Sequence, residues 1–160
     1  MTRKKWILLA EDNASDTALI LRSLADSYLP PAVVAVRDSS EALNCLYRRN
    51  NFQARHAGNP AVVLLGLNSP KGDGWEVLRQ IKSDPRLKTI PVVVLSSSRE
   101  ANDVARSYRL GANAYVPKPP QYRQLVGALE EVRTFWISLN ESPPADGDKE
   151  GSGLAQPMAA

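Results

Sequence analysis

Five short apolar runs alternate along the chain with segments that have the spacing of amphipathic helices. The runs are built mainly from valine, leucine, isoleucine and alanine, and they cover residues 6–10, 32–36, 61–65, 92–95 and 114–116. Such short runs, bounded by turn-forming residues, are typical of strands that are buried on both faces. Because a helical segment follows each run after a short connection, the pattern predicts an α/β fold, a five-stranded parallel sheet with helices on both faces.

Residues that cap helices mark where several of the helical segments begin. Asn13, Asp38 and Asp73 each stand three residues before an acidic residue, the spacing of a cap with a charged first turn. Ser97 and Glu100 predict a further helix from about 98 to 110, with Gly111 as its left-handed C-cap. Apolar stripes are expected on the first helix and on the last, from about 121 to 138: Ala18, Leu21, Leu24, Ala25 and Tyr28, then Tyr122, Leu125, Val126, Leu129, Val132 and Trp136.

The length and composition suit one folded unit followed by a polar tail. The chain has 160 residues, of which 43% are hydrophobic, enough for a single domain with a full core. We expect this domain to cover residues 5–138, and residues 139–160, rich in Pro, Gly, Ser and Asp, to form a disordered tail. The single cysteine, Cys45, excludes an intramolecular disulfide, and no run has the length of a membrane span, so a cytoplasmic protein without a membrane partner is expected.

The charge balance raises the question of a nucleic-acid partner. Residues 138–160 hold four acids and one base, so the rest of the chain carries 19 bases against 13 acids. These bases are scattered, and no basic run exceeds Arg3-Lys4-Lys5. A mildly basic, solvated surface is therefore favoured over a nucleic-acid footprint, and direct DNA binding is not expected.

Chemically complementary residues follow four of the predicted strands: Glu11 and Asp12 after the first, Gly66 and Asn68 after the third, Ser96 after the fourth and Lys118 after the fifth. The carboxyl ends of parallel strands meet at one edge of the sheet, where α/β proteins bind their ligands. Two adjacent carboxylates near a carbonyl oxygen suit Mg²⁺, and a lysine with a hydroxyl could hold the oxygens of a phosphoryl group. Singly, each residue could be a cap or a solvated charge, but the combination favours a site.

With these residues in place, the chain resembles the receiver domains of two-component response regulators over about residues 5–138. The resemblance rests on Glu11-Asp12, Leu64-Leu65-x-Leu-Asn-x-Pro-Lys-x-Asp-Gly, Ile90-Pro91, Ser96, Gly111-Ala112 and Tyr115-x-x-Lys118-Pro119. The long loop after the second helix, Ser83-Asp84-Pro85 and the pair Phe135-Trp136 look like the stand-alone regulators that are paired with bacterial phytochromes.

The resemblance implies a flavodoxin-like sheet in strand order 2-1-3-4-5 and a role in a phosphorelay rather than as an enzyme. It implies Mg²⁺ at Glu11, Asp12 and the Asn68 carbonyl, with phosphate contacts from Ser96 and Lys118 as the catalytic pair. It further implies a switch aromatic at Tyr115 and a cis bond before Pro119. The implied partners are a sensor histidine kinase, in particular a phytochrome, and a second copy bound through the fourth helix, fifth strand and last helix. No DNA-binding segment follows the receiver, so output is expected through protein contacts.

The chain departs from the family at position 66. Family members carry an aspartate there, the nucleophile that accepts the phosphoryl group, whereas this chain has Gly66, which has no side chain to phosphorylate. Asp12 is expected to bind metal and Asp73 to cap a helix, so neither replaces the missing acid. We therefore expect no aspartyl phosphate at position 66. Mg²⁺ binding is expected to be weakened or absent, because fewer acids attract the cation.

Three functions compete at this stage. The first is a response regulator whose phospho-switch is disabled, with a phosphorylation-independent pseudo-receiver that serves in docking or dimerisation as its alternative. The second is a hydrolase or nucleotide site with Ser96 or Ser97 as the nucleophile, which is weak because no histidine is placed as a base and no phosphate-binding glycine motif follows the first strand. The third is the nucleic-acid binder.

Overall fold

The structure is a computed structural model that describes residues 4–56, 58–67 and 74–144. All five strands are parallel and stand in the order β2-β1-β3-β4-β5, which confirms the predicted flavodoxin-like topology. The strands are β1 Trp6–Ala10, β2 Ala32–Val36, β3 Val62–Leu65, β4 Val92–Ser96 and β5 Ala114–Pro117. The helices are α1 Ala14–Ala25, α2 Ser39–Leu46, α3 Gly74–Ser83, α4 Ala101–Arg109 and α5 Tyr122–Arg133, with a 3₁₀ turn at Asn50–Phe52 and a π-helix at Thr134–Leu139.

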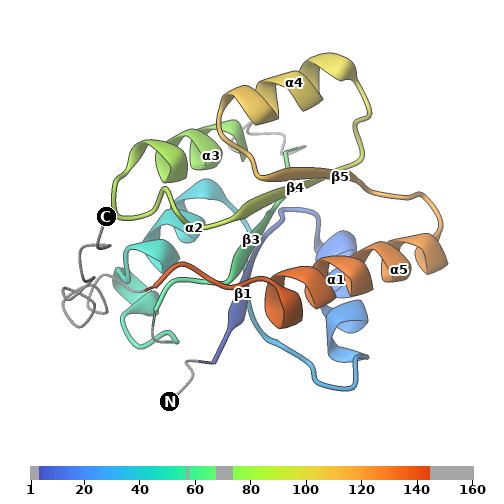
Figure 1. Cartoon of the computed structure of the whole chain (residues 1–160), viewed down its shortest axis with the longest axis horizontal. Helices are drawn as coiled ribbons and strands as arrows, with labels where there is room; N and C mark the ends of the chain where they lie inside the picture. The colour runs from blue at the N-terminus through green and yellow to red at the C-terminus, as the bar shows by residue number, and fades with distance from the viewer. Residues whose placement is uncertain (1–3, 57, 68–73, 145–160) are drawn as a thin grey trace, which may run out of the picture.

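Alternate residues of the central strands supply two hydrophobic layers. In β1, Trp6 and Leu8 pack on the side of α2 and α3, whereas Ile7 and Leu9 pack on the side of α1 and α5. This is the period of two that a strand imposes on its side chains. Figure 1 shows α1 and α5 next to each other on one side of the sheet and α3 on the other. Because both faces are covered, β1, β3 and β4 are fully buried, as their apolar sequences predicted.

Two predicted caps are confirmed, and both lie at the edge of the sheet where the strands end. The Asn13 side chain accepts a hydrogen bond from the Asp16 N–H, and the Asp38 side chain accepts one from the Glu41 N–H. Gly111 has a φ of 104° and ends the turn after α4, as expected of a left-handed C-cap. The Asp73 cap lies outside the described residues.

The predicted start of α4 was wrong. The helix begins at Ala101 with Glu100 as its N-cap residue, which makes no side-chain cap hydrogen bond, so Ser97 is not the N-cap of this helix. Instead, the Ser98 hydroxyl accepts a hydrogen bond from the Glu100 N–H and donates one to the Asp103 carboxylate. The Ser98 hydroxyl thus links the loop at the carboxyl end of β4 to Asp103 in the first turn of α4, and residues 98–100 remain part of that loop.

The apolar stripe predicted for the first helix was also wrong in part. The helix ends at Ala25, and its buried face centres on Ile20, Ser23 and Leu24. Tyr28 lies beyond the helix and is 98% exposed. On the last helix, Leu125 and Leu129 are buried as expected, whereas Tyr122 is exposed. Amphipathic spacing therefore located both helices but did not fix which edge of each stripe meets the sheet.

Candidate functional site

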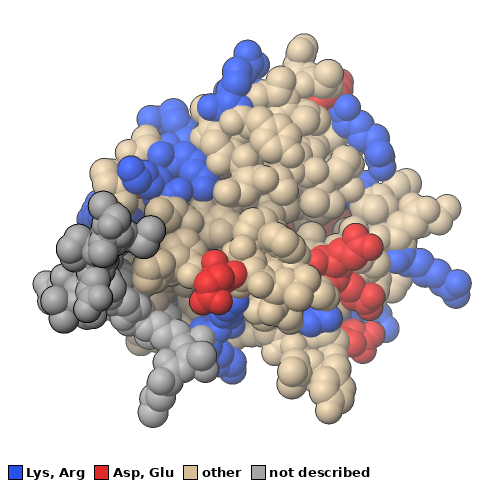
Figure 2. Space-filling model, viewed as in Figure 1, with Lys and Arg blue, Asp and Glu red and all other residues tan. Residues whose placement is uncertain are grey.

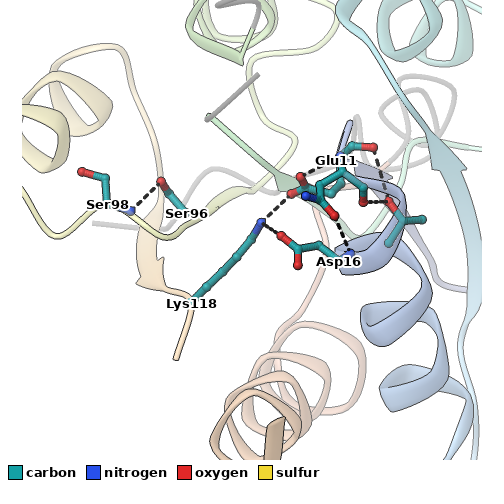
Figure 3. A network of polar contacts seen from close by, with 7 residues as sticks. Glu11, Asp16, Ser96, Ser98 and Lys118 are labelled. Carbon is teal, nitrogen blue, oxygen red and sulfur yellow. Dashed lines mark hydrogen bonds and ion pairs between the residues drawn. The ribbon is translucent and has the colours of Figure 1, made fainter. Parts of the chain in front are cut away.

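Four segments meet at the carboxyl edge of the sheet, where the sequence predicted a site. Main-chain hydrogen bonds hold them: the Gly66 N–H donates to the Ala10 carbonyl at 2.9 Å, and the Lys118 N–H donates to the Ser96 carbonyl at 2.7 Å. Figure 3 shows the Glu11 and Lys118 side chains pointing toward each other from the ends of β1 and β5, with Ser96 nearby. The fold thus brings together Glu11, Gly66, Ser96 and Lys118, which are far apart in the sequence.

The Glu11 side chain lies directly over Gly66. A Cβ atom placed on Gly66 would come within 2.5 Å of Glu11 Oε2, closer than non-bonded atoms approach. The Glu11 side chain is almost completely buried, and its other carboxylate oxygen, Oε1, accepts a hydrogen bond from the Asn13 N–H at 3.2 Å. The space in which a side chain at position 66 would begin is therefore filled by the carboxylate of a neighbouring segment.

Lys118 is held between two carboxylates. Its Nζ atom lies 2.8 Å from Glu11 Oε2 and 2.8 Å from Asp16 Oδ2, and the lysine side chain is only 13% exposed. Burial by itself would lower the pKa of the Lys118 ammonium. The hydrogen bonds to Asp16 and Glu11 outweigh that effect, so the pKa of Lys118 is raised and the residue stays charged.

Ser96 and Tyr115 are connected through the loop that follows β4. Ser96 is buried, and its hydroxyl accepts a hydrogen bond from the Ser98 N–H at 3.2 Å. The Tyr115 hydroxyl donates to the Ser98 carbonyl at 2.8 Å, so the aromatic ring of β5 is tied to the same loop. The expected phosphate contact and the expected switch aromatic therefore share one loop residue.

Another carboxylate at this edge, Asp12, lines a small cavity of about 20 Å³, which has room for about one water molecule. Asp38, Gly66 and Gly74 also line this cavity. In the described part of the chain, no three His, Cys, Asp or Glu side chains are placed to hold one metal ion. Both oxygens of Glu11 are already engaged, and the expected ligand Asn68 lies outside the described residues. In the arrangement seen, the Glu11 carboxylate is paired with the Lys118 ammonium and the Asn13 N–H rather than free to bind a divalent cation.

A groove of about 450 Å³ opens beside the ion pairs. Its walls combine charged and apolar side chains: Asp16, Leu19, Ser97, Arg99, Lys118, Pro119, Pro120, Tyr122 and Leu125. The groove therefore runs between α1, the loop after β4 and the start of α5, with the buried ammonium among its lining groups. The predicted cis bond before Pro119 was wrong, since residues 4–56, 58–67 and 74–144 contain no cis peptide bond. The trans form is the intrinsically favoured isomer of such a bond.

The structure offers no support for the hydrolase hypothesis or for the nucleic-acid hypothesis. The described histidine, His56, packs against the Trp6 ring at the opposite, amino end of β1, so it cannot serve Ser96 as a base. Figure 2 shows Lys and Arg side chains in separate groups on the visible face, divided by neutral surface and by acidic side chains. Neither the hydrolase nor the nucleic-acid hypothesis gains support from these arrangements.

Asp16 is the site residue that the sequence did not indicate. Its position in the first turn of α1 was explained by helix capping alone, because a carboxylate there favours the helix N-terminus. Its contact with Lys118 depends on how α1 and the end of β5 are placed in space. No local spacing in the sequence carries that information.

The comparisons agree with the fold. The model of the response regulator receiver domain matches residues 7–130. The response regulator Rcp1 of Synechocystis sp. is 36% identical over 88% of this chain and 95% of its own length. The structure of the phosphorylated cyanobacterial phytochrome response regulator RcpA has 44% identity and a TM-score of 0.80, covering 89% of this chain and all of that one. The Mn²⁺-bound form of Rcp1 has 36% identity and a TM-score of 0.78, covering 88% of this chain and 99% of that one. Within the described residues, no helix is long and apolar enough to cross a membrane.

Proposed function

The chain belongs to the response regulator receiver family, and from that premise we propose that it works in phytochrome-linked signalling without a phosphoryl group at position 66. Its similarity to Rcp1 and RcpA over most of their lengths supports a histidine kinase of the phytochrome class as the partner. The absence of a side chain at Gly66 supports the second half of the proposal. The observation that carries it is the Glu11 carboxylate over Gly66: it occupies the space that a side chain at position 66 would enter, so an acceptor carboxylate there would first have to displace it.

The kinase is proposed to dock at the groove beside Lys118. Leu19, Tyr122 and Leu125 offer apolar contact there, and Arg99 and Asp16 offer charged groups that can fix the register of a partner helix. Loss of phosphorylation does not remove this surface, so a chain that cannot accept a phosphoryl group can still occupy the kinase. Competition with a phosphorylatable regulator is a direct consequence.

A homodimer through α4, β5 and α5 is proposed as the output form. Large aromatic side chains are exposed on this side of the fold and in the π-helix that extends α5: Tyr108, Tyr122 and Phe135. Phe135 also packs edge-on against Trp136, with ring centroids 4.8 Å apart, so its ring is held in place before any partner binds. Sedimentation at micromolar protein, with and without Phe135→Ser, tests the dimer.

The central test is treatment with acetyl phosphate and Mg²⁺, read by intact mass, on this chain and on Gly66→Asp. We expect only the aspartate variant to gain a hydroxylamine-labile phosphoryl group. Labelling of the glycine form to a similar extent would contradict the proposal. A chain that fails to label but also fails to bind a phytochrome histidine kinase would contradict the signalling half alone.

In the pseudo-receiver alternative, phosphorylation has no effect on the chain. In that case oligomeric state and partner binding are the same with and without a phosphoryl donor, even for Gly66→Asp. A change in either property that appears only in phosphorylated Gly66→Asp would instead show that the switch machinery around Ser96 and Tyr115 is intact.

A further inference from the structure

Three charged side chains beside Gly66 form a pair of linked ion pairs. Glu11 and Asp16 contribute two carboxylates, and Lys118 contributes one ammonium that lies at hydrogen-bonding distance from both. The three groups come from the end of β1, the first turn of α1 and the end of β5, so the contacts join both halves of the sheet. Two of the three N–H donors of the Lys118 ammonium are used in these hydrogen bonds. The side chains of Glu11 and Lys118 are both largely buried.

The position that the Glu11 carboxylate holds overlaps the space that a side chain at position 66 would need. The nearest atom to a Cβ at Gly66 is Glu11 Oε2 at 2.5 Å, and the next is the carboxyl carbon at 3.1 Å. Any other residue would require the Glu11 carboxylate to shift from the position it now holds. The size of residue 66 therefore affects whether the Glu11 carboxylate can stay paired with the Lys118 ammonium.

We propose that the Lys118 ammonium is the resident cation of this site, held by Glu11 and Asp16 in place of a divalent metal ion. A divalent cation must take Glu11 from Lys118 before it can use that carboxylate. It must also approach an ammonium whose charge opposes it. Cation binding and the Glu11–Lys118 ion pair are thus coupled, and each weakens the other by the same factor.

Divalent cation affinity should rise in two variants that add no oxygen ligand. Removing Lys118 adds no oxygen atom, yet it should create a better divalent cation site, because the Glu11 and Asp16 carboxylates lose their counter-charge. Gly66→Ala also adds no ligand, yet it should improve binding by expelling Glu11 from the ion pair. The Gly66→Ala gain should act through Glu11 alone, so Glu11→Gln should cancel it; in Lys118→Met, Glu11→Gln should remove only the part of the gain that Glu11 supplies.

The experiment measures Mn²⁺ affinity by the loss of the free-ion EPR signal, and Mg²⁺ affinity by competition, for the full chain and its variants. We expect Lys118→Met to bind Mn²⁺ at least about tenfold more tightly than the original chain, a change of one decade in Kd. Lys82→Met is the matched control, because the Lys82 ammonium donates to the Ile90 carbonyl and to Asn113 rather than to a carboxylate. It should leave Mn²⁺ affinity unchanged.

Two outcomes would overturn the inference: tight Mn²⁺ binding by the original chain, or equal affinity in the original chain and Lys118→Met. If Lys118→Met folds only when Mn²⁺ is present, that result supports the proposal, since the metal ion then replaces the ammonium. If it does not fold at all, Gly66→Ala decides: unchanged affinity refutes the coupling, and a several-fold gain that Glu11→Gln abolishes supports it. Neither result depends on phosphoryl transfer, so the inference can fail while the proposed function stands.

Discussion

The ion pair between Lys118 and Glu11 should contribute strongly to stability. In Lys118→Met without metal ions, the almost completely buried Glu11 carboxylate loses its partner, which costs about 3–5 kcal/mol by the measured range for broken buried pairs. The Asp16 carboxylate is 36% exposed, so losing its pair adds at most about 1 kcal/mol. Because domains of this kind are stable by only about 5–15 kcal/mol, Lys118→Met should lose a large part of its free energy of unfolding.

Urea unfolding in EDTA at pH 7, followed by far-UV circular dichroism, measures this change. The double variant Lys118→Met/Glu11→Gln should regain most of the loss, since neither residue then leaves a buried charge. Lys82→Met serves as the control for removing a lysine with neutral partners. A loss below about 1 kcal/mol in Lys118→Met, or no recovery in the double variant, would refute the reasoning. The slope of the urea dependence must stay constant for the comparison to hold.

Three further predictions concern groups around the sheet. The pKa of Lys118 is raised in the folded state, so its contribution to stability is complete below the unfolded pKa and is lost as the pH rises through the folded pKa. Above about pH 10.5, the free energy of unfolding should therefore fall more steeply with pH for the original chain than for Lys118→Met, as urea unfolding at a series of pH values would measure. The Arg55 guanidinium donates to the carbonyls of Cys45, Leu46, His56 and Gly58, so Arg55→Ala should lower the free energy of unfolding by about 2–3 kcal/mol, and a loss under 1 would contradict that role. Asn13→Ala removes the cap of α1 and should cost about 1 kcal/mol in urea unfolding, whereas Asn13→Asp should cost nearly nothing.

The sheet could be predicted because its information is local. Each buried strand is a continuous apolar run, and the connections at Asn13 and Asp38 carry their own caps, so the sequence predicts a parallel sheet with helices on both faces. The strand order 2-1-3-4-5 was instead implied by the family resemblance. The start of α4 was missed because the Ser98 hydroxyl bonds the Glu100 N–H and the Asp103 carboxylate, and three neighbouring serines offer alternatives that spacing does not rank.

Most of the residues at the site could be predicted, but Asp16 and the contacts among the residues could not. Parallel strand ends placed Glu11, Ser96 and Lys118 at one edge, and the structure brings them there. The direction of the Glu11 side chain depends on a volume left by Gly66, on an ammonium that arrives from residue 118 and on Asp16. Each contact joins residues that are distant in the chain or compete for one space, so no local pattern specifies it.

Whether Gly66→Ala raises or lowers the free energy of unfolding separates the steric effect of a side chain at position 66 from the effect on backbone entropy. Gly66 is not among the described glycines with positive φ, so an alanine fits its backbone and would ordinarily stabilise the protein by about 0.4–1 kcal/mol. Here the added Cβ would meet Glu11 Oε2 at 2.5 Å and displace the carboxylate from Lys118. Gly66→Ala should therefore be destabilising in the original chain and stabilising in a Glu11→Ala background, as measured by urea unfolding in EDTA. The same sign in both backgrounds would mean that the Glu11 side chain moves aside without cost, and that glycine is not needed to hold the ion pair.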